Sequence, residues 1–195
     1  GRNGQSGNLI PPDDFASLRE QESIAALGVL GIPRERIASL GIHDQSTVRH
    51  INKIVESIYS KIKENRPKIV LLPAWEGAHP DHDIIHFCTA IAVAEYNQNH
   101  PDSPVIPFEY AEYNNFSDTV NYKQLIPVKA TQNIRIRLPN REMWIFAMEK
   151  HKSQMEDLSK FIQSAPSLDE VRLLPQHNYL ERPHSGKLYY ETWPC

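Results

Sequence analysis

An apolar run that leads through a loop of small residues into the sequence His-Pro-Asp-His constrains the fold of this chain most strongly. Residues 68–73 are apolar after the initial lysine, which is typical of a strand buried in a parallel sheet. Pro80 suits the first position of a helix, where its missing N–H costs nothing. The two histidines and the aspartate therefore lie at the carboxyl end of a buried strand, where open α/β sheets place their ligand sites.

The residues of this motif, His79, Asp81 and His82, have the chemistry of metal ligands. A catalytic zinc needs three protein ligands and an open position. Because neighbouring positions at a helix start point in different directions, we expect one ligand, one electrostatic partner and one carboxylate that orients an imidazole. Two alternatives stay open. The histidines could hydrogen-bond locally at a capped helix, or His82 and His86 could bind zinc as an i,i+4 pair.

The pattern of apolar residues and caps predicts alternating strands and helices. Helices are predicted at 14–30, 46–65, 80–96, 140–163 and 167–171. Strands are predicted at 37–42, 68–73, 108–113 and 134–138. His43 and Asp44 follow the first of these strands. We expect an α/β fold with a largely parallel sheet and helices on both faces, formed by residues 1–195 as a single domain.

Composition excludes several classes of protein. The formal net charge of -3 and the absence of a basic block argue against a nucleic-acid partner. No apolar run approaches the ~20 residues of a membrane span. Two cysteines, Cys88 and Cys195, are too few for a disulfide framework, and Cys88 in an apolar helical stretch is expected to be a core residue. We expect a cytoplasmic protein.

Residues 74–82, Ala-Trp-Glu-Gly-Ala-His-Pro-Asp-His, resemble the second signature of the LmbE-like, or PIG-L, family of metal-dependent de-N-acetylases. Three further segments are similar to other motifs of this family: Arg19 and Glu22 with the small-residue run at 25–28, His-Lys-Ser-Gln at 151–154, and Tyr190-Glu191. The resemblance covers most of the chain.

This resemblance implies a Rossmann-like hydrolase in which a metal, usually zinc, polarises the amide carbonyl and activates water. By position, His82 is implied as a metal ligand. His79 is implied beside the developing oxyanion, where it helps to protonate the amine, and Asp81 tunes it. The implied substrate-binding residues are Arg19, Trp75 and Glu76; for Arg19, a solvated arginine on a helix stays an equal alternative.

The family's first signature, His-Pro-Asp-Asp-Glu, is absent. The most similar segment, residues 10–15, has Pro11 where the ligating histidine belongs. We therefore expect an LmbE-like fold without its N-terminal strand unit, lacking the general base and two metal ligands. On this expectation the chain alone neither binds zinc nor catalyses, so its status as an enzyme is uncertain. The strand at 68–73 is expected to border a gap in the sheet that a missing N-terminal segment or a neighbouring copy fills.

The function implied by the resemblance is hydrolysis of an N-acetyl group from an amino-sugar substrate, such as an N-acetylglucosamine derivative, by a zinc-dependent de-N-acetylase. The alternative is a non-catalytic sugar-binding or interaction module that has lost the metal. In both cases the expected partner is a small, sugar-like molecule.

Overall fold

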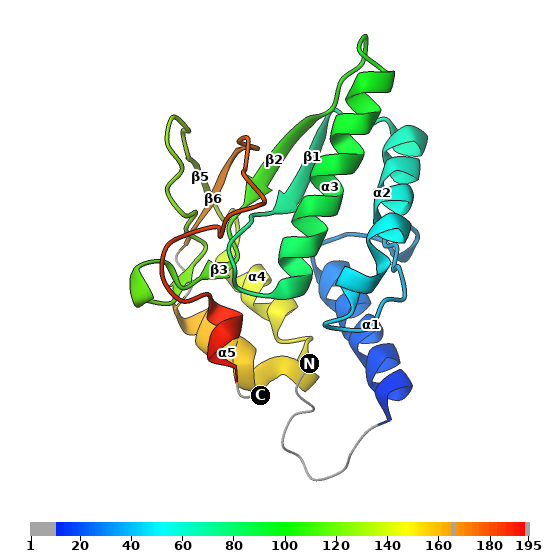
Figure 1. The fold of residues 1–195 in the computed structure, drawn as a ribbon. Helices are drawn as coiled ribbons and strands as arrows, with labels where there is room; N and C mark the ends of the chain where they lie inside the picture. The colour runs from blue at the N-terminus through cyan, green and yellow to red at the C-terminus, as the bar shows by residue number, and fades with distance from the viewer. Residues whose placement is uncertain (1–10, 165–166, 194–195) are drawn as a thin grey trace. The chain divides into compact units, whose positions relative to one another are not determined.

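The computed structural model describes residues 11–164 and 167–193 of the chain, shown in Figure 1. The chain divides into two compact units. The first comprises residues 1–43 and 137–167, and the second comprises residues 44–136 and 168–195. In the described ranges, no helix combines the length and the apolar character that a membrane crossing requires.

The first unit contains three helices: α1 (Pro12–Val29), α4 (Arg141–Met148) and α5 (Met155–Ser164). The prediction of one helix over 140–163 is wrong, because a 3-10 turn at Lys152–Gln154 separates α4 from α5. At this turn the carboxylate of Glu22 on α1 accepts hydrogen bonds from the backbone N–H and the hydroxyl of Ser153, at 2.8 and 2.6 Å. A contact between residues far apart in the sequence thus accompanies the break.

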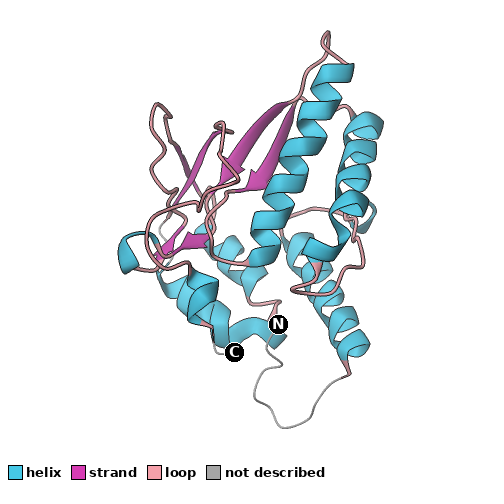
Figure 2. Cartoon of the chain, viewed as in Figure 1, coloured by secondary structure: helices cyan, strands magenta, loops and turns pink. Residues whose placement is uncertain are grey.

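The second unit is built on a four-stranded sheet (Figure 2). Its strands, in spatial order, are β1 (Ile69–Pro73), β2 (Ile106–Tyr110), β6 (Leu168–Leu173) and β5 (Ile134–Arg137). The α/β class is confirmed. However, the expectation of a largely parallel sheet is wrong, because β1 and β2 are parallel whereas β2 and β6 are antiparallel.

Two predicted elements are wrong, because their structure depends on contacts with residues distant in the sequence. The segment 167–171, predicted as a helix, contributes instead to β6, where Glu170 and Arg172 are buried. Each has an oppositely charged partner on a neighbouring strand, Arg135 or Glu109. The predicted strand at 37–42 does not form, and no described strand pairs with it.

Helices α2 (Ile51–Asn65) and α3 (Pro80–Asn99) pack on each other, and α3 contacts β1. A 3-10 turn at Thr47–His50 precedes α2. The core between these helices and the sheet consists of Ile62, Val93, Tyr96 and Val105, with Ile58, Tyr59 and Val70 packed against it. Two short strands, β3 (Tyr113–Asn114) and β4 (Asn121–Tyr122), form a separate antiparallel pair after β2.

Strand β1 forms one edge of the sheet, with β2 as its only neighbour among the described strands. The side chains of Ile69 and Leu71 are 53% and 61% exposed, and Ile106 and Leu173 are exposed beside them. Within this unit the described helices therefore leave part of one face of the sheet exposed. The four described strands form one continuous sheet. The position beside β1 that was expected to be a gap within the sheet is therefore the outer edge of the sheet.

Candidate functional site

The loop between β1 and α3 brings His79 and His82 together at the carboxyl end of β1. His79 is the N-cap of α3, and its Nδ1 atom accepts a hydrogen bond from the backbone N–H of Asp81 at 3.1 Å. His82 lies within the first turn of α3, and the two imidazole rings stack with their centroids 5.0 Å apart. Both side chains thus lie on the same side of the helix start.

The other nitrogen of His79 faces an aspartate that precedes α2. Its Nε2 atom lies 3.6 Å from Oδ1 of Asp44. Because Nδ1 accepts a hydrogen bond, the proton of the neutral ring is on Nε2. His79 therefore presents an N–H donor on this side.

The carboxylate of Asp81 holds the segment that leads into α2. Its oxygens accept hydrogen bonds from the backbone N–H of Gln45, at 2.6 Å, and from the hydroxyl and backbone N–H of Thr47, at 2.6 and 3.3 Å. The negative charge of Asp81 favours the protonated form of His79. The side chain of Asp81 thus combines an anchoring contact with an electrostatic effect on His79.

His82 is paired with Glu112, which follows β2. The Nδ1 atom of His82 lies 2.8 Å from Oε2 of Glu112. Burial lowers the pKa of His82, but the hydrogen bond and the charge of Glu112 outweigh it, so this pKa is raised. In contrast, burial lowers the pKa of His79 to about 4, and the charge of His82 adds to this effect. The pKa values of the two neighbouring imidazoles are therefore shifted in opposite directions.

Sequence reasoning missed the roles of Asp44 and Glu112. A signal existed for Glu112, because the carboxyl ends of adjacent parallel strands meet at the same edge of a sheet. Strands β1 and β2 are such a pair. For Asp44 the only signal was its place after an expected strand that does not form.

Glu76 is buried within the loop, where both carboxylate oxygens have partners in the protein. Oε2 accepts a hydrogen bond from the backbone N–H of Glu112, and Oε1 accepts one from the side-chain amide of Asn114, both at 3.0 Å. Burial raises the pKa of Glu76 to about 8. The backbone N–H groups of Glu76 and Gly77 in turn donate to Asp83 Oδ1, each at 3.1 Å. These contacts make Glu76 a residue that positions the loop.

The other two predicted substrate-binding residues lie in different units. Trp75 is half-buried and packs against the rings of His177 and Tyr179, with centroids 5.4 and 5.1 Å away. Arg19 is half-buried on α1 in the first unit, one turn before Glu22.

Aromatic rings from two segments surround the paired histidines. Trp193, near the end of the described chain, packs against His79 with centroids 5.2 Å apart. Tyr113 packs against His82 at 5.9 Å and against Tyr189 at 5.4 Å. All three aromatic residues are partly exposed. The site therefore offers aromatic surface beside its polar groups.

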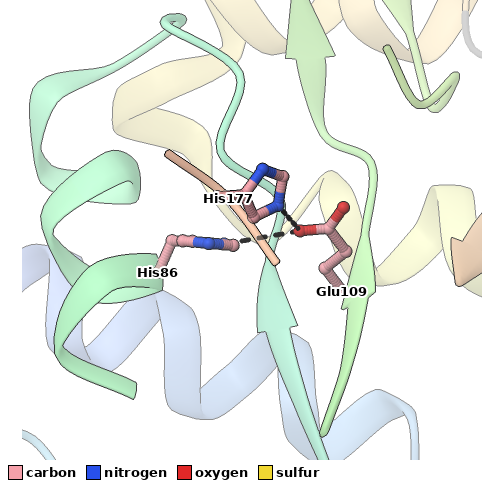
Figure 3. A group of neighbouring side chains, drawn as sticks. All are labelled: His86, Glu109 and His177. Atoms are coloured by element: carbon pink, nitrogen blue, oxygen red, sulfur yellow. Dashed lines mark hydrogen bonds and ion pairs between the residues drawn. The ribbon is translucent and has the colours of Figure 1, made fainter. Parts of the chain in front are cut away.

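A second cluster is made of His86 on α3, Glu109 on β2 and His177 (Figure 3). Ligand atoms of these residues lie within 4.8 Å of one another. However, Glu109 already forms a buried ion pair with Arg172 and a hydrogen bond with His177. The cluster is thus a hydrogen-bonded network, and we assign no metal to it.

The fully buried His86 also excludes the alternative of an i,i+4 zinc pair with His82. Its Nδ1 atom lies 2.8 Å from the carbonyl oxygen of Pro73, and its Nε2 atom lies 2.9 Å from the hydroxyl of Tyr179. His82 instead bonds to Glu112. His86 therefore links α3 to the end of β1 through its hydrogen bond with Pro73.

A family model described as GlcNAc-PI de-N-acetylase, PIG-L, matches residues 1–93, a range that includes His79, Asp81 and His82. Residues 1–93 of the chain are therefore similar to the PIG-L family. No curated protein matches the chain.

Three solved structures resemble the chain in fold. The zinc-inhibited form of teicoplanin deacetylase Orf2 aligns with a TM-score of 0.55 and 17% identity, over 82% of this chain and 74% of that one. A deacetylase triple mutant from the teicoplanin biosynthetic pathway aligns with a TM-score of 0.58 and 22% identity, over 83% and 71%. A deacetylase–bog complex from the same pathway aligns with a TM-score of 0.58 and 18% identity, over 82% of this chain and 73% of that one. The fold is therefore that of these deacetylases.

The PIG-L family implies a divalent metal, and His82 has the bonding of a metal-ligating histidine. Its Nδ1 atom is bound to a carboxylate, and no described residue bonds to Nε2. A second set of possible ligands, Asp44, His79 and Asp81, lies next to His82, but the oxygens of Asp81 already hold the segment before α2. The described residues thus fit one ligand position of a catalytic zinc, which needs three.

Proposed function

We propose that this chain carries the His-Pro-Asp-His side of the active site of a zinc-dependent de-N-acetylase, which removes the acetyl group from an amino sugar such as an N-acetylglucosamine derivative. The match of residues 1–93 to the PIG-L family supports this proposal. The observation that carries it is the pairing of His79 and His82 at the end of β1, where the rings stack 5.0 Å apart and the Nδ1 atom of each ring has a partner within the protein.

In this proposal His82 binds the metal through Nε2, because Glu112 takes Nδ1. When bound, the metal would supply the Lewis acidity that polarises an amide carbonyl and lowers the pKa of a water molecule. His79 donates a hydrogen bond from its Nε2–H group to the oxyanion that develops on the acetyl carbonyl. Asp81 acts through His79 by way of its backbone N–H and its charge.

The aromatic rings of Tyr113, Tyr189 and Trp193 provide a surface for the apolar face of a sugar ring. Trp75 and Arg19 stay predicted substrate contacts. Glu76 has its carboxylate engaged within the loop, and we assign it to holding the loop in place. A cytoplasmic setting belongs to the same proposal.

Acetate release from N-acetylglucosamine derivatives by the full-length gene product tests this function. We expect release that a chelator abolishes and added zinc restores. Binding of the sugar without acetate release at any zinc concentration would contradict the proposal and would favour the sugar-binding module.

A further inference from the structure

We infer that Glu112 is a positioning residue that fixes the tautomer and the orientation of His82, so that the lone pair of Nε2 is directed toward the reacting atoms. This inference rests on the proposed function. Metal-ligating histidines typically donate their other ring N–H to a carboxylate or a carbonyl, which fixes the ring and raises its basicity. The 2.8 Å contact between His82 Nδ1 and Glu112 Oε2 has this arrangement.

The position of Glu112 is itself fixed by the protein. Its backbone N–H donates to buried Glu76, and its carbonyl oxygen accepts a hydrogen bond from the backbone N–H of Lys123 at 2.9 Å. The main chain of Glu112 is therefore held by two hydrogen bonds.

The contacts of Glu76 extend this support back to α3. Glu76 bonds to Glu112 and Asn114, while Asp83 accepts the backbone N–H groups of Glu76 and Gly77. Asp83 directly follows His82 in α3. The helix that carries the histidine and the segment that carries its carboxylate are thus joined by a closed set of hydrogen bonds. A side-chain substitution at Glu112 leaves the main-chain bonds of this set in place.

The test uses Glu112→Ala and Glu112→Gln in the full-length gene product, with Glu56→Ala as the matched control, because Glu56 is exposed on α2 in the same unit. Two-dimensional ¹H–¹⁵N spectra of the imidazoles report the tautomer of His82 in metal-free protein. We expect the parent and Glu56→Ala to show the Nδ1–H tautomer. Glu112→Ala loses it, and Glu112→Gln retains part of it because the amide oxygen still accepts a hydrogen bond.

Zinc titrated into the same samples provides the second measurement, followed on the signals of His82. We expect Glu112→Ala to weaken zinc binding by about 10–100-fold, and Glu112→Gln to weaken it less. An unchanged tautomer and an unchanged zinc affinity in folded Glu112→Ala would overturn the inference. If Glu112→Ala does not fold, Glu112→Gln decides by the same comparison. If the parent binds no zinc, the proposed metal role of His82 fails, whereas the tautomer still decides the role of Glu112.

Discussion

Glu109 and Arg172 lie directly opposite each other on the antiparallel strands β2 and β6 and form an ion pair that is almost completely buried. Arg172 Nε donates to Glu109 Oε1 at 2.6 Å, and a second guanidinium nitrogen donates to the carbonyl oxygen of Ile126 at 2.6 Å. Burial raises the pKa of Glu109, but the hydrogen bond of His177 and the charge of Arg172 outweigh it, so this pKa is lowered. The pair thus keeps a carboxylate charged inside the sheet.

Replacing Arg172 with Met is expected to lower the free energy of unfolding by about 3–5 kcal/mol, because it leaves the charge of Glu109 buried and without its main partner. The matched control is Arg135→Met. Arg135 pairs with Glu170 from a side chain that is 70% exposed, and such a pair is worth about 1 kcal/mol or less. Denaturant unfolding of both variants measures the difference. An equal loss of unfolding free energy in both variants would contradict the larger contribution assigned to the buried ion pair of Arg172.

Two adjacent leucines of β1 test the exposed face of the sheet. Leu72→Ala is expected to cost about 2–5 kcal/mol, because Leu72 is 1% exposed and its loss leaves a cavity. Leu71→Ala is expected to change the free energy of unfolding by about 0.5 kcal/mol or less, because Leu71 is 61% exposed. Denaturant unfolding measures both values. A large loss for Leu71→Ala would mean that another element covers this face in solution.

The strand at 68–73 and the helix after it could be predicted from the sequence, because their signals are local, although β1 lies at the edge of the sheet and is buried only in part. Residues 68–73 are apolar after Lys68, and Pro80 marks a helix start; both elements form at these positions. Cys88 is confirmed as a core residue, fully buried and with its pKa raised to about 11 by burial. The predicted edge strand at 134–138 is likewise confirmed as β5 at the edge of the sheet.

The errors concern segments whose structure depends on distant partners. Glu170 and Arg172 of β6 are buried beside oppositely charged partners, Arg135 and Glu109, that lie on neighbouring strands. The break between α4 and α5 involves Glu22, which lies 131 residues from Ser153. A strand at 37–42 would need a partner to form its hydrogen bonds, and none of the described strands supplies one. No local pattern contains this information.

The same distinction holds for the candidate site. His79, Asp81 and His82 belong to one short motif, so a local pattern was sufficient to find them. Glu112 is 30 positions away from His82 by sequence number and approaches it only because β2 lies beside β1. Asp44 approaches His79 through the segment that Asp81 holds in front of α2. Predicting these two residues required the order of the strands and the path of the loops.

The raised pKa of Glu76 predicts that part of the stability falls as the pH rises. Burial raises this pKa from about 4.5 in the unfolded chain to about 8 in the folded protein. Between these values the folded state binds more protons, so its stability decreases with a slope of up to about 1.4 kcal/mol per pH unit. This stabilisation is complete below about pH 4.5 and is lost as the pH rises through about 8.

Denaturant unfolding of the parent and of Glu76→Gln between pH 5 and 9 (roughly the window set by these two pKa values) measures this effect. We expect a smaller decrease of stability with pH in the variant, because glutamine does not ionise. The control is Glu56→Gln, an exposed position. Parallel pH profiles for the parent and Glu76→Gln would show that Glu76 ionises normally in the folded protein.

The central claim is that His82 holds the metal and His79 serves the reaction without holding it. Measuring bound zinc and acetate turnover side by side in His82→Ala and His79→Ala of the full-length gene product tests this claim most directly. We predict that His82→Ala loses zinc and activity together. We predict that His79→Ala retains zinc but loses turnover by roughly 10²–10³-fold, the effect of removing an oxyanion donor. Equal loss of zinc in both variants, or unchanged turnover in His79→Ala, would contradict the account.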